Sequence, residues 1–157
     1  MTIDLVLASD HRGLELKDYV AKWVVPIDET EVKSNITMFH DVGTYSPTSV
    51  DYPDIVKTFA DSMETFNRGI LFCGSGYGVC ISANRYKHIR AVTARTRQEA
   101  IMARLHNDAN VLCIGSDFTK PKDAIRIIGS FLDTEFEGGR HKRRVDKMSR
   151  LGESNDI

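Results

Sequence analysis

The sequence lacks the marks of several protein classes. Its three cysteines, Cys73, Cys80 and Cys113, include no short-spaced pair, which argues against a disulfide framework and against a zinc site. No apolar run approaches the roughly 20 residues of a membrane helix, and Met1–Asp4 carries no signal-peptide pattern. The net charge of -1 provides no overall field for nucleic acid or a membrane. We therefore expect a cytoplasmic protein that binds neither nucleic acid nor a membrane.

What remains is an ordinary globular composition. The 157 residues are 41% hydrophobic and 27% charged, which is enough for one complete core and short for two. We find no internal repeat and no linker. We expect residues 1–157 to form a single domain, with a frayed tail from residue 152 to residue 157.

Apolar runs alternate with segments of helical spacing along the whole chain. Strands that are apolar throughout, each followed by a helix, are typical of a parallel sheet covered on both faces. The sequence therefore predicts the α/β class, as a Rossmann-like three-layer sandwich with a five-stranded parallel sheet. We expect strands at 4–9, 37–42, 70–73, 90–94 and 110–115, and helices at 14–24, 51–66, after the glycines near 78, 96–107, 121–132 and 140–151.

Two helix starts have recognisable caps. Asp51 precedes Pro53 and is predicted to cap its helix, with Ile55, Phe59, Met63 and Phe66 as the apolar stripe. Thr96 and Glu99 form the pattern of a capping box. Pro26 is expected to close the first helix.

The chain is organised around the stretch from Ile70 to Asn84, in which Cys73 stands where an apolar strand ends. Gly74, Gly76 and Gly78 follow at alternate positions and allow a tight curl that turns backbone N–H groups toward one point. A helix start would add its own unpaired N–H groups there. A cysteine at a strand end is commonly a small core residue. The glycine turn favours a reactive thiol at Cys73, and we assign Cys80 and Cys113 to packing.

The glycine turn does not match the two common nucleotide signatures. A dinucleotide fingerprint requires G-x-G-x-x-G, whereas the spacing here is Gly74-x-Gly76-x-Gly78. A phosphate loop requires Gly-Lys followed by serine or threonine, but Val79 follows Gly78.

Polar residues follow other predicted strands. In a parallel sheet the ligand lies beyond the carboxyl ends of the strands, so Asp10, His11 and the turn after Cys73 can converge with the region after Ala94. Asp10 and His11 could equally be a helix cap and a surface histidine. His106 and Asn107 could be a simple helix end, and they need the fold or a second subunit to join the others. Together, a carboxylate, two histidines, a thiol and an N–H cluster suit proton transfer on a small polar substrate.

The last predicted helix is basic, as a solvated surface often is. Arg140 and Arg144 lie four residues apart on one face, and two guanidinium groups together suit a phosphate. The run is too short, and lacks the interleaved aromatic residues, to argue for nucleic acid.

These residues, taken in order, resemble the type B ribose-5-phosphate isomerases, in the larger group that includes galactose-6-phosphate isomerase. The resemblance extends from Leu5 to about Met148. It is carried by Asp10-His11-x-Gly13, Asp51-Tyr52-Pro53, Cys73-Gly74-Ser75-Gly76-x-Gly78, Ala83-Asn84-Arg85, Ile89-Arg90-Ala91, His106-Asn107-Asp108-x-Asn110-Val111-Leu112 and Glu137-Gly138-Gly139-Arg140-His141.

The resemblance implies an aldose–ketose isomerisation of a phosphorylated sugar through a cis-enediolate, with no metal and no cofactor. Cys73 matches the base that moves a proton between C2 and C1, and Ser75 the hydroxyl beside it. His106 matches the histidine that helps to open the sugar ring, and Asp10 the carboxylate that holds sugar hydroxyls. The turn from Gly74 to Gly78 would bind the enediolate oxygens through backbone N–H groups.

The resemblance also implies a phosphate clamp and an oligomer. His11, Arg140 and Arg144 match the clamp. Members of the family are dimers or tetramers with active sites built across two subunits, so His106, Asn107 and the two arginines could come from a neighbouring subunit.

The sequence departs from the family pattern in three places. Asp117 follows Gly115-Ser116 where an arginine is usual, so phosphate binding would depend more on Arg140, Arg144 and Lys120. The segment from Pro26 to Ser49 is longer than usual, and Thr93–Thr96 lacks the usual Cys-x-Asp.

We expect interconversion of ribose 5-phosphate and ribulose 5-phosphate, a step of the pentose phosphate pathway. Gly138-Gly139-Arg140-His141 favours the pentose over the alternative, an allose or galactose 6-phosphate isomerase. Two other classes stay open: a non-catalytic phosphosugar- or nucleotide-binding module, and an acyl-transfer enzyme with Cys73 as nucleophile and His106 as base.

Overall fold

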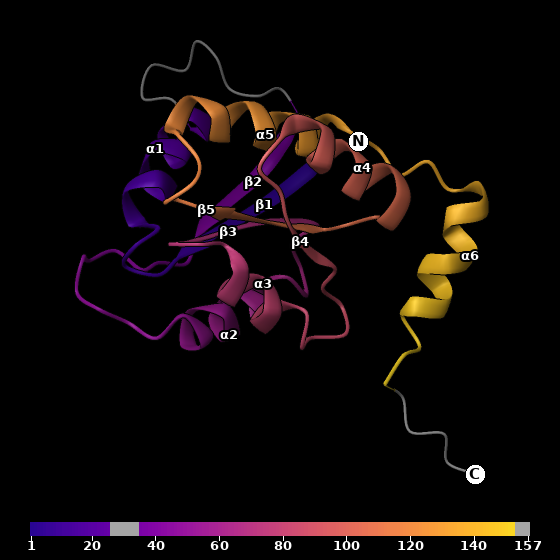
Figure 1. The fold of residues 1–157 in the computed structure, drawn as a ribbon, viewed down its shortest axis with the longest axis horizontal. Coiled ribbons are helices and arrows are strands. Elements are labelled where there is room, and N and C mark those ends of the chain that lie inside the picture. The colour runs from indigo at the N-terminus through magenta and orange to yellow at the C-terminus, as the bar shows by residue number, and fades with distance from the viewer. Residues whose placement is uncertain (26–34, 153–157) are drawn as a thin grey trace.

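The computed structural model describes residues 1–25 and 35–152. Their order confirms the predicted α/β class: five parallel strands form one sheet in the order β2-β1-β3-β5-β4, with helices on both faces (Figure 1). The proposed end of the first helix at Pro26, the first part of the long segment to Ser49 (residues 26–34), and the tail beyond Gly152 lie outside the described residues. The strands are β1 (Ile3–Ser9), β2 (Ile36–Asp41), β3 (Arg68–Cys73), β4 (Ala91–Thr93) and β5 (Val111–Gly115), and the helices are α1 (Leu14–Val24), α2 (Tyr52–Ser62), α3 (Tyr77–Ala83), α4 (Arg97–Asn107), α5 (Pro121–Asp133) and α6 (Gly139–Met148).

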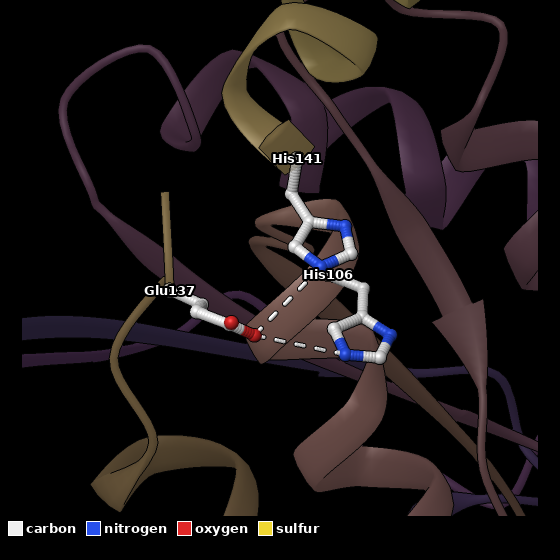
Figure 2. Close-up of side chains that lie close together, drawn as sticks. All are labelled: His106, Glu137 and His141. Atoms are coloured by element: carbon white, nitrogen blue, oxygen red, sulfur yellow. Dashed lines mark ion pairs between the residues drawn. The ribbon is translucent and has the colours of Figure 1, made fainter. Parts of the chain in front are cut away.

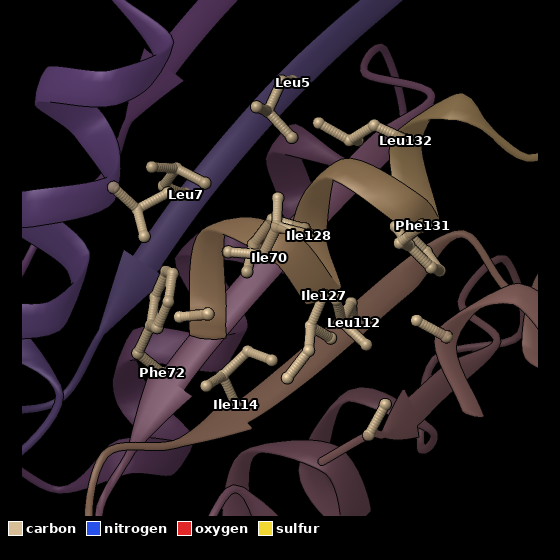
Figure 3. Close-up of a cluster of buried hydrophobic side chains, with 14 of the residues drawn as sticks. Leu5, Leu7, Ile70, Phe72, Leu112, Ile114, Ile127, Ile128, Phe131 and Leu132 are labelled. Atoms are coloured by element: carbon tan, nitrogen blue, oxygen red, sulfur yellow. The ribbon is translucent and has the colours of Figure 1, made fainter. Parts of the chain in front are cut away.

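The central strands are apolar on both faces because helices cover both. Alternate side chains point to opposite faces of a strand, so Phe72 packs with α1, α4 and α5 while Leu71 and Cys73 pack with α2 and α3. Figure 3 shows the first of these two cores, in which Ile127 and Ile128 of α5 lie over β3 and β5.

Helix α6 belongs to neither core. It lies apart from the sheet at the edge of the molecule (Figure 1), and His141 and Val145 are its buried residues. Among the described residues, no helix combines the length and the apolar character needed to cross a membrane.

The caps show one confirmed prediction and one error. Thr96 and Glu99 exchange the two hydrogen bonds of a capping box at the start of α4. Asp51 precedes α2 as expected, but its side chain makes no cap hydrogen bond. Pro53 lacks the N–H that such a side chain would accept from the second helical residue, and the N–H of the third, Asp54, donates to the Asp51 backbone carbonyl at 3.1 Å.

The apolar stripe predicted for α2 is correct in the face it marks but too long. The helix ends at Ser62, so Met63 and Phe66 lie beyond it. Phe59 and Met63 are buried in the second core, and Ile55 and Phe66 pack against that core partly buried.

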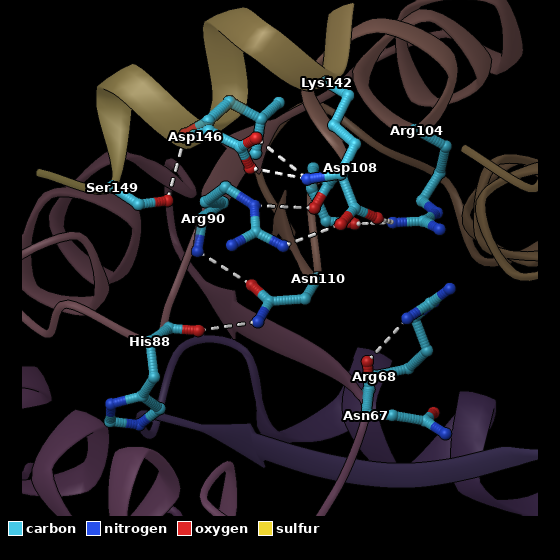
Figure 4. A network of polar contacts seen from close by, with 12 residues as sticks. Asn67, Arg68, His88, Arg90, Arg104, Asp108, Asn110, Lys142, Asp146 and Ser149 are labelled. Atoms are coloured by element: carbon cyan, nitrogen blue, oxygen red, sulfur yellow. Dashed lines mark hydrogen bonds and ion pairs between the residues drawn. The ribbon is translucent and has the colours of Figure 1, made fainter. Parts of the chain in front are cut away.

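A polar network fixes the start of β5 (Figure 4). Asp108 adopts a left-handed φ of 46°. Its carboxylate binds Arg90 at 2.9 Å and Arg104 at 2.8 Å. Asn110 accepts a hydrogen bond from the Arg90 N–H at 2.7 Å and donates one to the His88 carbonyl at 2.8 Å. The network ties α4 to the segment that precedes β4.

Candidate active site

Cys73 is the last residue of β3, a strand whose six residues are all buried. Its side chain is 4% exposed, and Sγ accepts a hydrogen bond from the Gly76 N–H at 3.1 Å. Gly76 has a φ of 81°, a conformation that favours glycine. The backbone after the strand therefore folds back onto the thiol, as the glycine spacing predicted.

The segment after β5 holds this turn. The Ser116 N–H donates to the Cys73 carbonyl at 2.9 Å, and the Asp117 N–H donates to the Gly74 carbonyl at 3.0 Å. A Cβ on Gly115 would lie 2.4 Å from the Ser75 carbonyl oxygen, so glycine is required for this approach. Ser75 Oγ accepts the Tyr77 N–H at 3.2 Å, which places its hydroxyl at the first residue of α3.

Gly78 has a packing role that the sequence did not indicate. A Cβ there would lie 2.7 Å from the ring of Tyr52, so the glycine lets the start of α2 approach α3. The region after Ala94 does meet this edge, as expected: the Arg95 guanidinium lies over the rings of Tyr77 and Phe118.

Asp10 and His11 lie at the carboxyl end of β1, on the same edge as Cys73. Asp10 is buried, and its Oδ1 accepts the N–H groups of Arg12 and Gly13 at 2.9 and 3.0 Å. These two bonds close a turn that precedes α1. The N-cap of α1 is Gly13, with no side-chain cap hydrogen bond, so Asp10 is not the helix cap that was the alternative to a substrate role. His11 Nδ1 accepts the Val50 N–H at 3.2 Å, which leaves Nε2 as the nitrogen able to donate.

His106 belongs to a different group of side chains, with Glu137 and His141 (Figure 2). The two imidazole rings stack with centroids 4.2 Å apart and planes 10° apart. Glu137 Oε2 lies 3.8 Å from His106 Nε2 and 3.7 Å from His141 Nε2. Desolvation, and then the neighbouring His106, lower the pKa of His141 below its ordinary value.

We do not assign this group to a metal. It is the one group of three or more His, Cys, Asp or Glu among the described residues that is close enough for an ion, with its ligand atoms within 4.8 Å of one another. The lone pairs of stacked rings run parallel within the ring planes, however, and cannot both point at one ion about 2 Å away.

The structure separates the two groups within one chain. Cys73 pairs with Gly115 at the end of β5, whereas His106 and Asn107 precede its start at Val111. Four residue steps along a strand cover roughly 13 Å. Arg140 and Arg144 are exposed on α6, on the side of His106. His106, Asn107 and both arginines therefore do not meet Cys73 in a single subunit.

A cavity lies beside Asn107. It has a volume of about 660 Å³. Residues between Asn84 and Val92 line one side of it, and Met148 and Leu151, at and just beyond the end of α6, line the other. Both of these apolar side chains are exposed. Helix α6 is thus incompletely covered by its own chain.

Two pairs of residues were missed by the sequence reasoning. Arg12 and Asp117 form an ion pair at 2.6 Å beside Gly74. Cys80 was assigned to packing, but a hydrogen bond from the Cys113 thiol lowers the pKa of Cys80 to about 6, against the opposing effect of burial. Burial raises the pKa of Cys113 well above its usual value, in keeping with a core residue. No local signal marks either pair, because their members lie far apart in the sequence.

Comparisons with known proteins agree over nearly the whole chain. The family model described as Ribose/Galactose Isomerase matches residues 5–148. The probable ribose-5-phosphate isomerase B of Mycoplasma genitalium is 38% identical over 154 residues, covering 96% of each chain. A putative sugar phosphate isomerase of Rickettsia bellii is 40% identical over 149 residues, covering 94% of this chain and 98% of the other.

Solved structures agree equally well. The ribose 5-phosphate isomerase of Thermotoga maritima superposes with a TM-score of 0.86 at 38% identity, covering 96% of this chain and 100% of the other. A ribose-5-phosphate isomerase B of Mycoplasma genitalium, solved with ribulose 5-phosphate bound, gives a TM-score of 0.83 at 36% identity and covers 96% of each chain.

Proposed function

Since this chain belongs to the ribose/galactose isomerase family, we propose that it interconverts D-ribose 5-phosphate and D-ribulose 5-phosphate with Cys73 as the base. The observation that carries the proposal is the thiol at the end of β3, with the Gly76 N–H bonded to Sγ at 3.1 Å. A similar solved structure holds ribulose 5-phosphate, which supports the choice of sugar. We propose the cytoplasm as its location and the pentose phosphate pathway as its setting.

The chemistry needs a base and a group that stabilises negative charge. In the proposed reaction, the Cys73 thiolate takes the proton from C2 of the open-chain aldose, and the electrons move onto the carbonyl oxygen to give the enediolate. The hydroxyl proton then moves from O2 to O1, and return of the carbon-bound proton from Cys73 to C1 gives the ketose with its carbonyl at C2. Backbone N–H groups of the turn from Gly74 to Gly78, with the Ser75 hydroxyl, would hold the enediolate oxygens, and one preorganised donor of this kind contributes about 3 kcal/mol to transition-state stabilisation.

Asp10 and His11 would bind the rest of the sugar in this proposal. The Asp10 oxygen Oδ1 is occupied by two backbone N–H groups, so a sugar hydroxyl would be held by Oδ2. His11 presents Nε2 as a donor to the phosphate. No step uses a metal or a cofactor.

We further propose a homodimer, or a tetramer built from such dimers, in which each site uses two chains. The ring-opening histidine and the phosphate-binding arginines lie roughly one strand length from Cys73 in their own subunit, so a second copy would supply them. The exposed Met148 and Leu151 beside the cavity at α6 support this proposal, because a partner could cover them. His106, Asn107, Arg140 and Arg144 would then complete the site from across the interface.

The first experiment measures ribose 5-phosphate conversion in the presence of EDTA for the wild type, Cys73→Ala and a control variant, Cys80→Ala. We expect turnover that resists EDTA, survives in the control and falls by at least about 1,000-fold in Cys73→Ala. Full activity in Cys73→Ala would disprove the role of the thiol. Faster turnover of allose or galactose 6-phosphate than of ribose 5-phosphate would assign the chain to a hexose substrate instead.

A further inference from the structure

Arg12 lies between β1 and α1, directly beside the turn that follows Cys73. Its guanidinium NH2 group lies 2.6 Å from Asp117 Oδ2, and the two side chains are 58% and 43% exposed. The rest of the guanidinium lies against Gly74: a Cβ added there would be 2.7 Å from Cζ and 2.8 Å from NH1 of Arg12. The absence of a side chain at position 74 is what lets the cation lie on the turn.

Backbone contacts join the same three segments. Ser116 Oγ lies 2.9 Å from the Arg12 carbonyl oxygen and 3.1 Å from the Cys73 carbonyl oxygen. The Asp117 N–H donates to the Gly74 carbonyl at 3.0 Å. The side-chain pair of Arg12 and Asp117 therefore closes a ring of contacts that already links the ends of β1, β3 and β5.

An ion pair this exposed contributes little to the stability of a fold. Its position is what gives it significance, because it covers the residue between the proposed base and the N–H groups proposed to hold the enediolate. Donors of that kind work only when they are fixed before the charge develops, and a small displacement is expensive in rate.

We propose that Arg12, held in place by Asp117, is a positioning residue that keeps the turn from Gly74 to Gly76 in its catalytic shape. The proposal rests on the isomerase function proposed above. It also assigns a role to Asp117, where the family resemblance had led us to expect an arginine near the phosphate. Its carboxylate orients the Arg12 guanidinium.

The kinetic test compares Arg12→Ala, Asp117→Asn and Arg12→Lys with the wild type on ribose 5-phosphate. We expect kcat to fall about 10-fold in the first two with KM changed less than about twofold, because the transition state is affected and not binding. Arg12→Lys keeps a cation for Asp117 and should recover most of the rate. The matched control is Arg126→Ala, which breaks an exposed pair with Asp123 on α5 and should leave kcat unchanged.

A second measurement does not depend on activity. Hydrogen exchange of the Gly76 and Asp117 amides reports the shape of the turn, and we expect it to accelerate about 3- to 5-fold in Arg12→Ala but not in Arg126→Ala. Unchanged exchange would overturn the proposal whatever the substrate proves to be. A rise in KM alone would also overturn it, since Arg12 would then bind substrate directly. If amide exchange accelerates in Arg12→Ala as expected but the wild type turns over no ribose 5-phosphate, the proposed function is contradicted and the positioning role is not.

Discussion

The edge of the sheet around Cys73 and the group formed by His106, Glu137 and His141 are built in opposite ways. At the first, backbone atoms of three strand ends bond to one another and leave room for almost no side chain at Gly76 and Gly115. At the second, the three groups meet through their side chains, with one backbone bond from the Glu137 N–H to the Leu105 carbonyl at 3.2 Å, and one of their supports is α6, which lies outside both cores. This chain therefore builds one part of the proposed site from backbone contacts between strand ends and the other on a helix that lies outside its two cores.

The largest effect is expected from a methyl group in the first of these regions, around Cys73. Gly115→Ala would bring a Cβ within 2.4 Å of the Ser75 carbonyl oxygen, so β5 and the turn must separate. We expect at least about 100-fold loss of turnover, measured by the ribose 5-phosphate assay, and a loss of about 1–3 kcal/mol in the free energy of unfolding.

The matched variant is Gly139→Ala, at the start of α6, where no atom lies within 4 Å of the added Cβ. The only cost there is that alanine must adopt a positive φ of 53°, which lowers the free energy of unfolding by about 1 kcal/mol. Equal losses of turnover in the two variants would contradict the difference between the regions.

The second prediction tests whether the two regions meet between chains. Cys73→Ala and His106→Ala are each expected to be almost inactive. When they are unfolded together and refolded as a mixture, half the dimers are hybrids, and a shared site restores one of the two sites in each hybrid. Activity should therefore return to about a quarter of the wild-type value. Failure to recover any activity from a mixture that does form hybrids would mean that each site lies within one chain.

The third prediction concerns pH and the second region. Because the pKa of His141 is lowered, the unfolded chain binds a proton near pH 6.5 that the folded chain does not yet accept. Stability is therefore lost as the pH falls below about 6.5 toward the lower folded pKa. We expect the melting temperature of the wild type to drop by a few degrees more than that of His141→Gln between pH 7 and pH 5.

The control for that experiment is His40→Gln, because His40 is exposed on β2. It should retain the pH dependence of the wild type. A His141→Gln variant that retains it as well would show that another group titrates in this range.

The smallest expected effect is on the reactivity of Cys80, which lies on α3, the helix that follows the turn after Cys73. Cys80, with a pKa of about 6, should react with iodoacetamide at pH 7 and more slowly as the pH falls through 6. Cys113→Ala removes the thiol that donates to it and should slow alkylation several-fold, whereas Cys113→Ser keeps a donor and should slow it less. Peptide mapping by mass spectrometry identifies the modified residue. Equal rates in the two variants would contradict the assigned hydrogen bond.

The sequence alone was sufficient to predict those strands and helix starts that are marked by a local pattern of residues. Unbroken apolar runs located β1, β3 and β5, and the paired Thr96 and Glu99 located the start of α4. The strand end at Cys73 and the glycines after it predicted a backbone that curls onto the thiol, which the structure confirms.

The remaining features depend on pairing across long distances in the sequence. Arg12 meets Asp117, and Cys80 meets Cys113, only because the strand order brings β1, β3 and β5 together. A periodic pattern says which face of a strand is buried but not which neighbour it meets. The failed cap at Asp51 has a local cause, since Pro53 removed a donor that the pattern of residue types had assumed.

The network around Asp108 has a consequence for how this chain can vary. One carboxylate forms salt bridges with two guanidinium groups, and the side chain of Arg104 is only 2% exposed. Replacing Asp108 alone would leave a nearly buried positive charge without its partner, a change that is strongly destabilising. Replacing either arginine alone still leaves the other salt bridge intact. A series of single substitutions that avoids this loss of stability must therefore change Arg104 before Asp108. The burial of Arg104 sets the order in which these positions can vary.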